Sequence, residues 1–229
     1  MNISWFGHSC FRIETHSINS GQGKEGVSIL IDPFSKDIGL KPPRIKDDLI
    51  LVTHKHYDHN NVEGSPPQAM IIDGPGEYQK RGIYVRGILS YHDKVEGQER
   101  GLNTIYVMKA EDMTICHMGD FGQASFEKNQ IDDIGDIDIL MIPVGGKYTI
   151  DYKEAVELIG QIEPKIIMPM HYKITGLNLD VDGSDKFVKE LGLTPEKTDP
   201  ENLRLGVGKY RIAKKNLPVE EMKLVLFQN

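Results

Sequence analysis

The chain has 229 residues, of which 39% are hydrophobic and 27% charged, and this is the profile of a globular protein with one sizeable core. Its net charge of −7 argues against a nucleic-acid-binding protein with a broad basic face, and the lack of any run of about 18 apolar residues argues against a membrane span. No basic start followed by a long apolar stretch marks a signal peptide, and only Cys10 and Cys116 could pair, so we expect a cytoplasmic protein.

Short apolar runs predict β-strands over residues 28–31, 49–52, 83–89, 104–108, 113–116, 137–142 and 165–168. Continuous apolar runs of this length are typical of strands buried on both faces. Helical spacing predicts helices over 125–131, 152–162 and 184–191, with Asp151 and Ser184 as N-caps, and residues 20–25 read as a polar hairpin tip. The mixture predicts an α/β fold, with sheets covered by helices, in a single domain over residues 1–229.

The densest group of chemically active side chains is the segment 53–59, Thr-His-Lys-His-Tyr-Asp-His, which directly follows a predicted buried strand. Three histidines and an aspartate within six residues are hard to place in a core, because each buried imidazole needs a partner. In an extended loop His54 and His56 project the same way and can share one cation, while Asp58 and His59 turn toward a second position. Imidazole nitrogen and carboxylate oxygen bind zinc-like ions at about 2.0–2.2 Å. The spacing therefore indicates a metal site rather than a surface histidine cluster.

Four ligands in one loop cannot enclose two ions, so other segments must contribute. Three candidates each follow an apolar strand, namely His92, Asp120 and His171. Polar groups at strand ends, aimed into a shared crevice, are where open sheets keep their sites. Each of these residues alone could be a solvated loop residue, but their order after a complete histidine motif favours ligation.

These motifs resemble those of the metallo-β-lactamase superfamily, and most closely its branch of small stand-alone hydrolases that includes the ascorbate-6-phosphate lactonases. The resemblance runs from Trp5-Phe6-Gly7-His8 to about Leu191 and implies a four-layer αβ/βα sandwich with the metals at one edge, between the sheets. It implies that one metal is held by His54, His56 and His92, that the other is held by Asp58, His59 and His171, and that Asp120 bridges both. It also implies that Asp32 supports a ligand histidine, because a metal-bound imidazole usually donates its other N–H to a carboxylate.

Further residues near these motifs are candidates for supporting roles. His8, in a Gly-His-Ser turn, is a candidate for contact with metal or substrate, or for capping the turn. His117 is expected to be a packed, hydrogen-bonded histidine outside the ligand set, and Asp93 either orients a ligand or ends a strand. Lys147 and Lys173 lie next to motif residues and are our candidates for contacts to an anionic substrate, although lysines in loops are usually only solvated.

The sequence thus predicts a metal-dependent hydrolase of a small anionic substrate, either a phosphodiester or a phosphorylated lactone. Two divalent ions would lower the pKa of a bridging water so that hydroxide attacks, and Asp58 would guide its proton as well as ligate. A nitrogen and oxygen donor set without cysteine suits zinc first, with manganese, nickel or iron as alternatives. A nuclease of the same fold and a non-catalytic metal-binding protein stay open as alternatives, and the oligomeric state is left open too.

Overall fold

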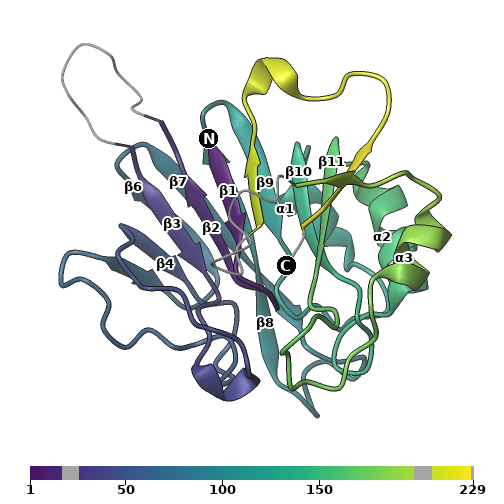
Figure 1. Ribbon diagram of the computed structural model, residues 1–229, viewed down its shortest axis with the longest axis horizontal. Coiled ribbons are helices and arrows are strands. Elements are labelled where there is room, and N and C mark those ends of the chain that lie inside the picture. The colour runs from purple at the N-terminus through teal and green to yellow at the C-terminus, as the bar shows by residue number, and fades with distance from the viewer. Residues whose placement is uncertain (17–25, 199–207, 228–229) are drawn as a thin grey trace.

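The computed structural model describes residues 1–16, 26–198 and 208–227, and its strands form two sheets (Figure 1). The six-stranded sheet contains, in spatial order, β13 (Gly208–Arg211), β1 (Asn2–Trp5), β2 (Phe11–Glu14), β3 (Ser28–Ile31), β4 (Leu49–Leu51) and β5 (Met70–Ile72). The eight-stranded sheet contains β12 (Glu196–Lys197), β14 (Lys223–Leu226), β11 (Ile166–Met170), β10 (Ile139–Pro143), β9 (Met113–His117), β8 (Leu102–Ala110), β7 (Ile83–Tyr91) and β6 (Gly76–Lys80). The hairpin tip expected over 20–25 lies outside the described residues.

The three α-helices lie beside the eight-stranded sheet (Figure 1). Helix α2 (Tyr152–Ile162) has the predicted bounds, since Asp151 caps it by accepting from two backbone N–H groups. Helix α3 (Asp185–Leu191) packs on α2 and ends at Gly192, as expected. Helix α1 (Lys128–Ile134) begins three residues later than predicted, because Glu127 is its cap and forms a reciprocal capping box with Gln130. Within the described part of the chain, no helix is long and apolar enough to cross a bilayer.

Strand β3 shows why its apolar run is continuous. Ile29 and Ile31 belong to the main core, which includes residues of both sheets, whereas Leu30 packs with Phe34 and Ile38 in a second cluster. Successive side chains of a strand point to opposite faces, so a strand covered on both sides needs apolar residues throughout. The second cluster includes a residue of the 3-10 helix η1 (Lys36–Ile38), so loops and η1 form the outer layer over β3. The chain therefore has the αβ/βα sandwich architecture expected from the sequence.

Strand direction determines where the loops of the two sheets meet. Strands β1, β3 and β4 run the same way, because β3 and β4 are parallel and β1 and β3 are each antiparallel to β2. In the other sheet β9, β10 and β11 are parallel, and β7 runs with them because both β7 and β9 are antiparallel to β8. The polar segments singled out in the sequence all follow carboxyl ends of these strands.

Candidate metal centre

The loops after six of these strands supply the side chains of the candidate centre. In chain order they are His8 after β1, Asp32 after β3, His54, His56, Asp58 and His59 after β4, His92 after β7, Asp120 after β9 and His171 after β11. All of them are buried except His56. Burying so many titratable groups together requires that they partner one another or an ion.

Three of these residues leave their strands through a left-handed backbone conformation that is uncommon outside glycine. The φ angles are +54° at His8, +47° at Asp32 and +53° at His171. Such conformations are strained for a residue with a Cβ, and they persist where the surroundings fix them. At each of these positions the chain turns sharply just after the strand, so that the side chain stays near the edge of its sheet.

One half of the centre contains His54, His56 and His92, whose ligand atoms lie within 4.8 Å of one another. His54 Nδ1 lies 3.0 Å from Thr53 Oγ1, whereas its buried Nε2 has no hydrogen-bond partner in the described protein. Burial, followed by the nearby charge of His59, lowers the pKa of His54. The ring is therefore neutral at ordinary pH and offers a free lone pair, which is the form that binds a cation.

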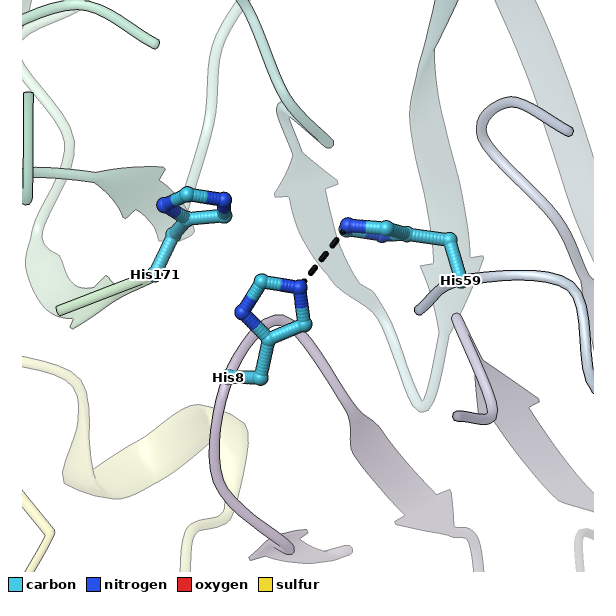
Figure 2. Close-up of side chains that lie close together, drawn as sticks. All are labelled: His8, His59 and His171. Carbon is cyan, nitrogen blue, oxygen red and sulfur yellow. Dashed lines mark hydrogen bonds between the residues drawn. The ribbon is translucent and has the colours of Figure 1, made fainter. Parts of the chain in front are cut away.

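The other half is the predicted set of Asp58, His59 and His171. Asp58 Oδ2 lies 3.7 Å from His59 Nε2, and Figure 2 shows that the rings of His59 and His171 converge with that of His8. His59 Nδ1 lies 2.9 Å from Asp32 Oδ2, and Asp32 also accepts from the backbone N–H and the hydroxyl of Thr53, both at 2.8 Å. Burial lowers the pKa of His59, but the carboxylates of Asp120 and Asp32 outweigh it and raise the value well above the ordinary one. The geometry places the Nδ1 proton toward Asp32 and leaves Nε2 facing the centre.

Asp120 lies between the two halves. Its Oδ2 is 3.1 Å from His171 Nε2, 3.3 Å from the Nε2 atoms of His59 and His92, and 4.0 Å from His54 Nε2. Burial raises the pKa of Asp120, but the charges of His171 and His59 outweigh it and hold the pKa well below the ordinary value. A single carboxylate oxygen shared by imidazoles from both halves is what a bridging ligand requires.

These distances fit divalent cations. Two neighbouring ligand atoms, each about 2.1 Å from one ion, lie about 3.0–3.4 Å apart. The distances from Asp120 Oδ2 to the nearest nitrogens of His59, His92 and His171 fall in this range. Lone pairs this close repel one another unless a proton or a cation lies between them. A donor set of imidazole nitrogens and carboxylate oxygens suits zinc, manganese, nickel or iron.

Two polar residues beside the centre have structural partners instead. His117 Nε2 lies 2.9 Å from the carbonyl oxygen of Ser9, and its Nδ1 accepts from the backbone N–H of Gly119 at 3.1 Å, so both ring nitrogens are satisfied, as predicted. Asp93 accepts from the backbone N–H groups of residues 95, 97, 99 and 100 at 2.8–3.0 Å. Asp93 therefore fixes the loop between β7 and β8.

That loop carries Arg100 to a cavity of about 340 Å³ that opens onto the metal centre. The cavity is lined by His56, Tyr57, Asp58, His92, Arg100, Asp120, Tyr148, His171 and Leu179. The guanidinium carbon of Arg100 lies 4.9 Å from the centroid of the Tyr148 ring, a cation–π arrangement. The cavity thus offers a cationic side chain on the wall that also exposes the candidate ligands.

Lys147 and Lys173, which were expected to contact substrate, both have partners within the protein and do not line this cavity. Lys147 is exposed and pairs with Asp180, while Lys173 Nζ donates to the carbonyl oxygens of Leu177 and Leu179 at 2.5 and 2.8 Å. Lys173 contacts its own loop, whereas Lys147 contacts the loop between β11 and α3. The cation that lines the cavity is Arg100, which lies eight residues after His92 in a stretch with no distinctive motif.

Sequence reasoning also missed residues that hold Asp120 in place. Asn103 Oδ1 accepts from the backbone N–H of Asp120 at 3.0 Å, and Ser9 Oγ donates to Asp120 Oδ1 at 3.4 Å. Gly119 has φ of +59°, and a Cβ there would lie 2.3 Å from Asn103 Oδ1. The signal in the sequence is an asparagine at the start of an apolar strand, and the structure shows that this amide is fully buried and therefore needs partners.

Comparison with known proteins agrees with this architecture. The family described as Beta-lactamase superfamily domain matches residues 2–171. A UPF0173 metal-dependent hydrolase from Staphylothermus marinus is 32% identical, with the match covering 85% of this chain and 93% of that protein. Another from Methanopyrus kandleri is 28% identical over 86% of this chain and 95% of its own length.

Among solved structures, a protein of the metallo-beta-lactamase superfamily from Thermotoga maritima matches with a TM-score of 0.75 and 30% identity, covering 99% of this chain and 97% of its own. These matches extend over most of each chain, so the likeness is not confined to the histidine motif. The chain therefore belongs to the β-lactamase superfamily, in its branch of small stand-alone metal-dependent hydrolases.

Proposed function

We propose that the enzyme hydrolyses a small anionic substrate with the help of two divalent cations. One cation would be held by His54, His56 and His92, the other by Asp58, His59 and His171, with Asp120 shared between them. The observation that carries this proposal is the position of Asp120 Oδ2, within 3.1–3.3 Å of histidines from both halves and on the wall of the cavity. When bound, the cations would acidify a water molecule and polarise the bond to be broken.

Asp58 is the side chain that we propose for proton handling. It lines the cavity, and its Oδ2 lies 3.2 Å from His8 Nε2 and 3.7 Å from His59 Nε2. Burial raises the pKa of Asp58, but the hydrogen bond from His8 and the charge of His59 outweigh it and lower the pKa below the ordinary value. Asp58 is therefore a carboxylate at neutral pH, able to accept a hydrogen bond from the attacking water and orient it.

Arg100 is the residue that we propose for substrate recognition. A guanidinium presents a planar fork of N–H donors that pairs with two oxygens of a phosphate or carboxylate. Tyr148 supports the face of this fork, and Leu179 provides an apolar contact on the same cavity wall. A cavity of about 340 Å³ is at the small end of ligand-binding pockets. These features favour a phosphodiester or a phosphorylated lactone.

We further propose that the chain acts as a single domain in the cytoplasm. The main core includes residues of both sheets, from Met1 to Phe227, which supports one cooperative unit. Cys10 and Cys116 are free and buried, as they are in proteins that need no disulfides. The net charge of −7 favours a small substrate over RNA, because nucleic-acid affinity depends on phosphate neutralisation by basic side chains.

Steady-state rates on a panel of substrates test the proposal. The panel contains bis(p-nitrophenyl) phosphate, a neutral p-nitrophenyl ester, a cephalosporin and a single-stranded RNA, each measured with Mn²⁺, Zn²⁺ and Ni²⁺. We expect the phosphodiester to have the highest kcat/KM and a chelator to abolish its turnover. Faster hydrolysis of the neutral ester or the cephalosporin with every metal would refute the anionic substrate, and preferred cleavage of RNA would make the enzyme a nuclease.

A further inference from the structure

The turn Gly7-His8-Ser9 places the side chain of His8 inside the metal centre. His8 is fully buried, and its φ of +54° follows a glycine with φ of +95°. The backbone of His8 is held on two sides, because its carbonyl oxygen accepts from Trp5 Nε1 at 3.0 Å and from the backbone N–H of His171 at 3.1 Å. The strained turn is thus fastened directly to the residue that begins the loop after β11.

The imidazole of His8 faces the second half of the centre (Figure 2). His8 Nε2 lies 2.9 Å from His59 Nε2 and 3.2 Å from Asp58 Oδ2. The centroid of its ring is 4.5 Å from that of His171 and 4.6 Å from that of His59. The ligand atoms of these three histidines lie within 4.8 Å of one another. The distances from His8 Nε2 to His59 Nε2 and to Asp58 Oδ2 are close to the spacing of about 3.0–3.4 Å between neighbouring ligand atoms on one cation.

Hydrogen bonding alone explains this arrangement poorly. His59 Nδ1 hydrogen bonds to Asp32, so Nε2 is the ring nitrogen that faces His8 Nε2. Once His59 Nε2 binds a cation, it can no longer form a hydrogen bond with His8. The opposite nitrogen of His8, Nδ1, is buried and has no partner in the described protein, so nothing fixes the ring from that side. A cation between the two Nε2 atoms would satisfy both.

We propose that His8 is an additional ligand of the cation held by Asp58, His59 and His171. With Asp120 as the shared ligand, this cation would have five protein donors, three nitrogens and two oxygens, whereas its neighbour would have four. Zinc in proteins is usually four-coordinate, while manganese, iron, nickel and cobalt accept five or six ligands. The two positions would therefore differ in metal preference, and the second would accommodate these metals better than the first does. The inference rests on the proposed two-cation centre.

Replacement of His8 by glutamine separates ligation from hydrogen bonding. The amide nitrogen of glutamine lies near the place of Nε2 and can donate to Asp58, but a neutral amide is a poor ligand for these cations. If His8 only orients Asp58, His8→Gln should behave like the wild type. His117→Gln is a matched control, because His117 is also fully buried and hydrogen bonds to the adjacent Ser9 without facing the ligand atoms.

Calorimetric titration with Co²⁺ and the visible absorption of the bound cobalt give readouts that do not depend on activity. We expect two Co²⁺ per chain in the wild type and in His117→Gln. In His8→Gln we expect the second Co²⁺ to bind at least about tenfold more weakly and to absorb more strongly, because cobalt with fewer ligands has more intense bands. Unchanged affinity and spectrum in His8→Gln would overturn the inference while leaving the two-cation centre intact. A wild type that binds only one Co²⁺ would instead refute the proposed centre.

A crystal structure of the cobalt-loaded wild type makes the test independent of whether the variant folds. An anomalous peak within about 2.3 Å of His8 Nε2 would establish ligation. A peak that lies on Asp58, His59 and His171 while His8 Nε2 donates to Asp58 would show that His8 only positions that carboxylate, and the inference would be wrong.

Discussion

The hydrogen bond between Asp32 and His59 decides which nitrogen of this imidazole is free for a cation. Asp32 Oδ1 accepts from the backbone N–H of Thr53, and Oδ2 accepts from its hydroxyl and from His59 Nδ1. In Asp32→Asn the amide oxygen can keep the backbone bond, and the amide nitrogen then faces His59 as a donor. His59 must present an unprotonated Nδ1, which moves its proton to Nε2, the nitrogen 3.3 Å from Asp120.

The expected loss of metal affinity in Asp32→Asn follows from the position of the Asp32 carboxylate behind His59. Loss of an outer partner of a metal-bound histidine weakens metal binding about 10- to 100-fold, or about 1.4–2.8 kcal/mol. Asp32→Asn also moves a proton onto the ligand atom of His59, so we expect the upper end of this range. The metal-free protein should lose about 1–3 kcal/mol of unfolding free energy, because fully buried hydrogen bonds to a carboxylate are replaced.

Titration calorimetry with Co²⁺ and thermal melts of the metal-free protein measure the two effects of Asp32→Asn. Asp47→Asn is the control, since Asp47 is also buried and pairs with Arg12 through two bonds of 2.8 and 2.9 Å at the opposite, amino end of β4. This control should lower Tm without changing the Kd for either Co²⁺. If Asp32→Asn bound both ions as tightly as the wild type, the argument that the tautomer of His59 controls the centre would fail.

Five further substitutions, arranged in three tests, probe other parts of the structure. Asp120→Ala should prevent binding of a second cation. His117→Ala should keep the metal content of the wild type and lose about 1–3 kcal/mol of unfolding free energy. Elemental analysis measures the metal content and thermal melts the stability, and the reverse pattern would contradict our assignment of both residues. Arg100→Gln should raise KM for a phosphodiester at least about tenfold, because a charged hydrogen bond contributes about 1.5–3 kcal/mol, and should leave KM for a neutral ester nearly unaffected. Lys173→Gln is the control and should change KM for neither substrate. Equal losses on both substrates in Arg100→Gln would exclude anion recognition by Arg100. Burial raises the pKa of Asp138, but hydrogen bonds from two lysines and a backbone N–H outweigh this effect and lower the pKa. The ionised Asp138 therefore stabilises the folded state fully above about pH 4, and this stabilisation is lost as the pH falls through the folded-state pKa. Asp138→Asn should therefore cost about 1 kcal/mol at pH 7, with a difference from the wild type that shrinks at pH 3 in urea melts; a larger difference at pH 3 would refute it.

The sequence was most informative about strands that are covered on both faces. The apolar runs that predicted β3, β4, β9, β10 and β11 all correspond to interior strands, where composition and burial agree. The interior strands β1, β2 and β14 were not predicted, and neither were the four edge strands β13, β5, β12 and β6. Ile71 in β5 is 47% exposed and β6 reads Gly-Glu-Tyr-Gln-Lys, so pairing with a neighbouring strand, and not local pattern, makes these segments strands.

The candidate centre was predictable where a ligand directly follows a strand. His92 and His171 come just after β7 and β11, so strand direction and the packing of the two sheets bring them close to the loop that begins at His54. Arg100 was not predictable, because its position depends on how Asp93 folds the following loop through four backbone hydrogen bonds. The positions of Lys147 and Lys173 were not predictable for the same reason, because loop conformation fixes where a long side chain points.

The two sheets contribute to the centre separately: Asp58 and His59 follow a strand of the six-stranded sheet, and His92 and His171 follow strands of the eight-stranded sheet. Any cation shared by ligands from both would tie the halves of the sandwich together at this edge. Metal binding and the packing of the two sheets are then thermodynamically linked. A free-ion concentration 100 times Kd would raise the free energy of unfolding by about 2.7 kcal/mol per site. Cellular metal supply would in this way regulate how long the enzyme persists, in addition to whether it turns over substrate.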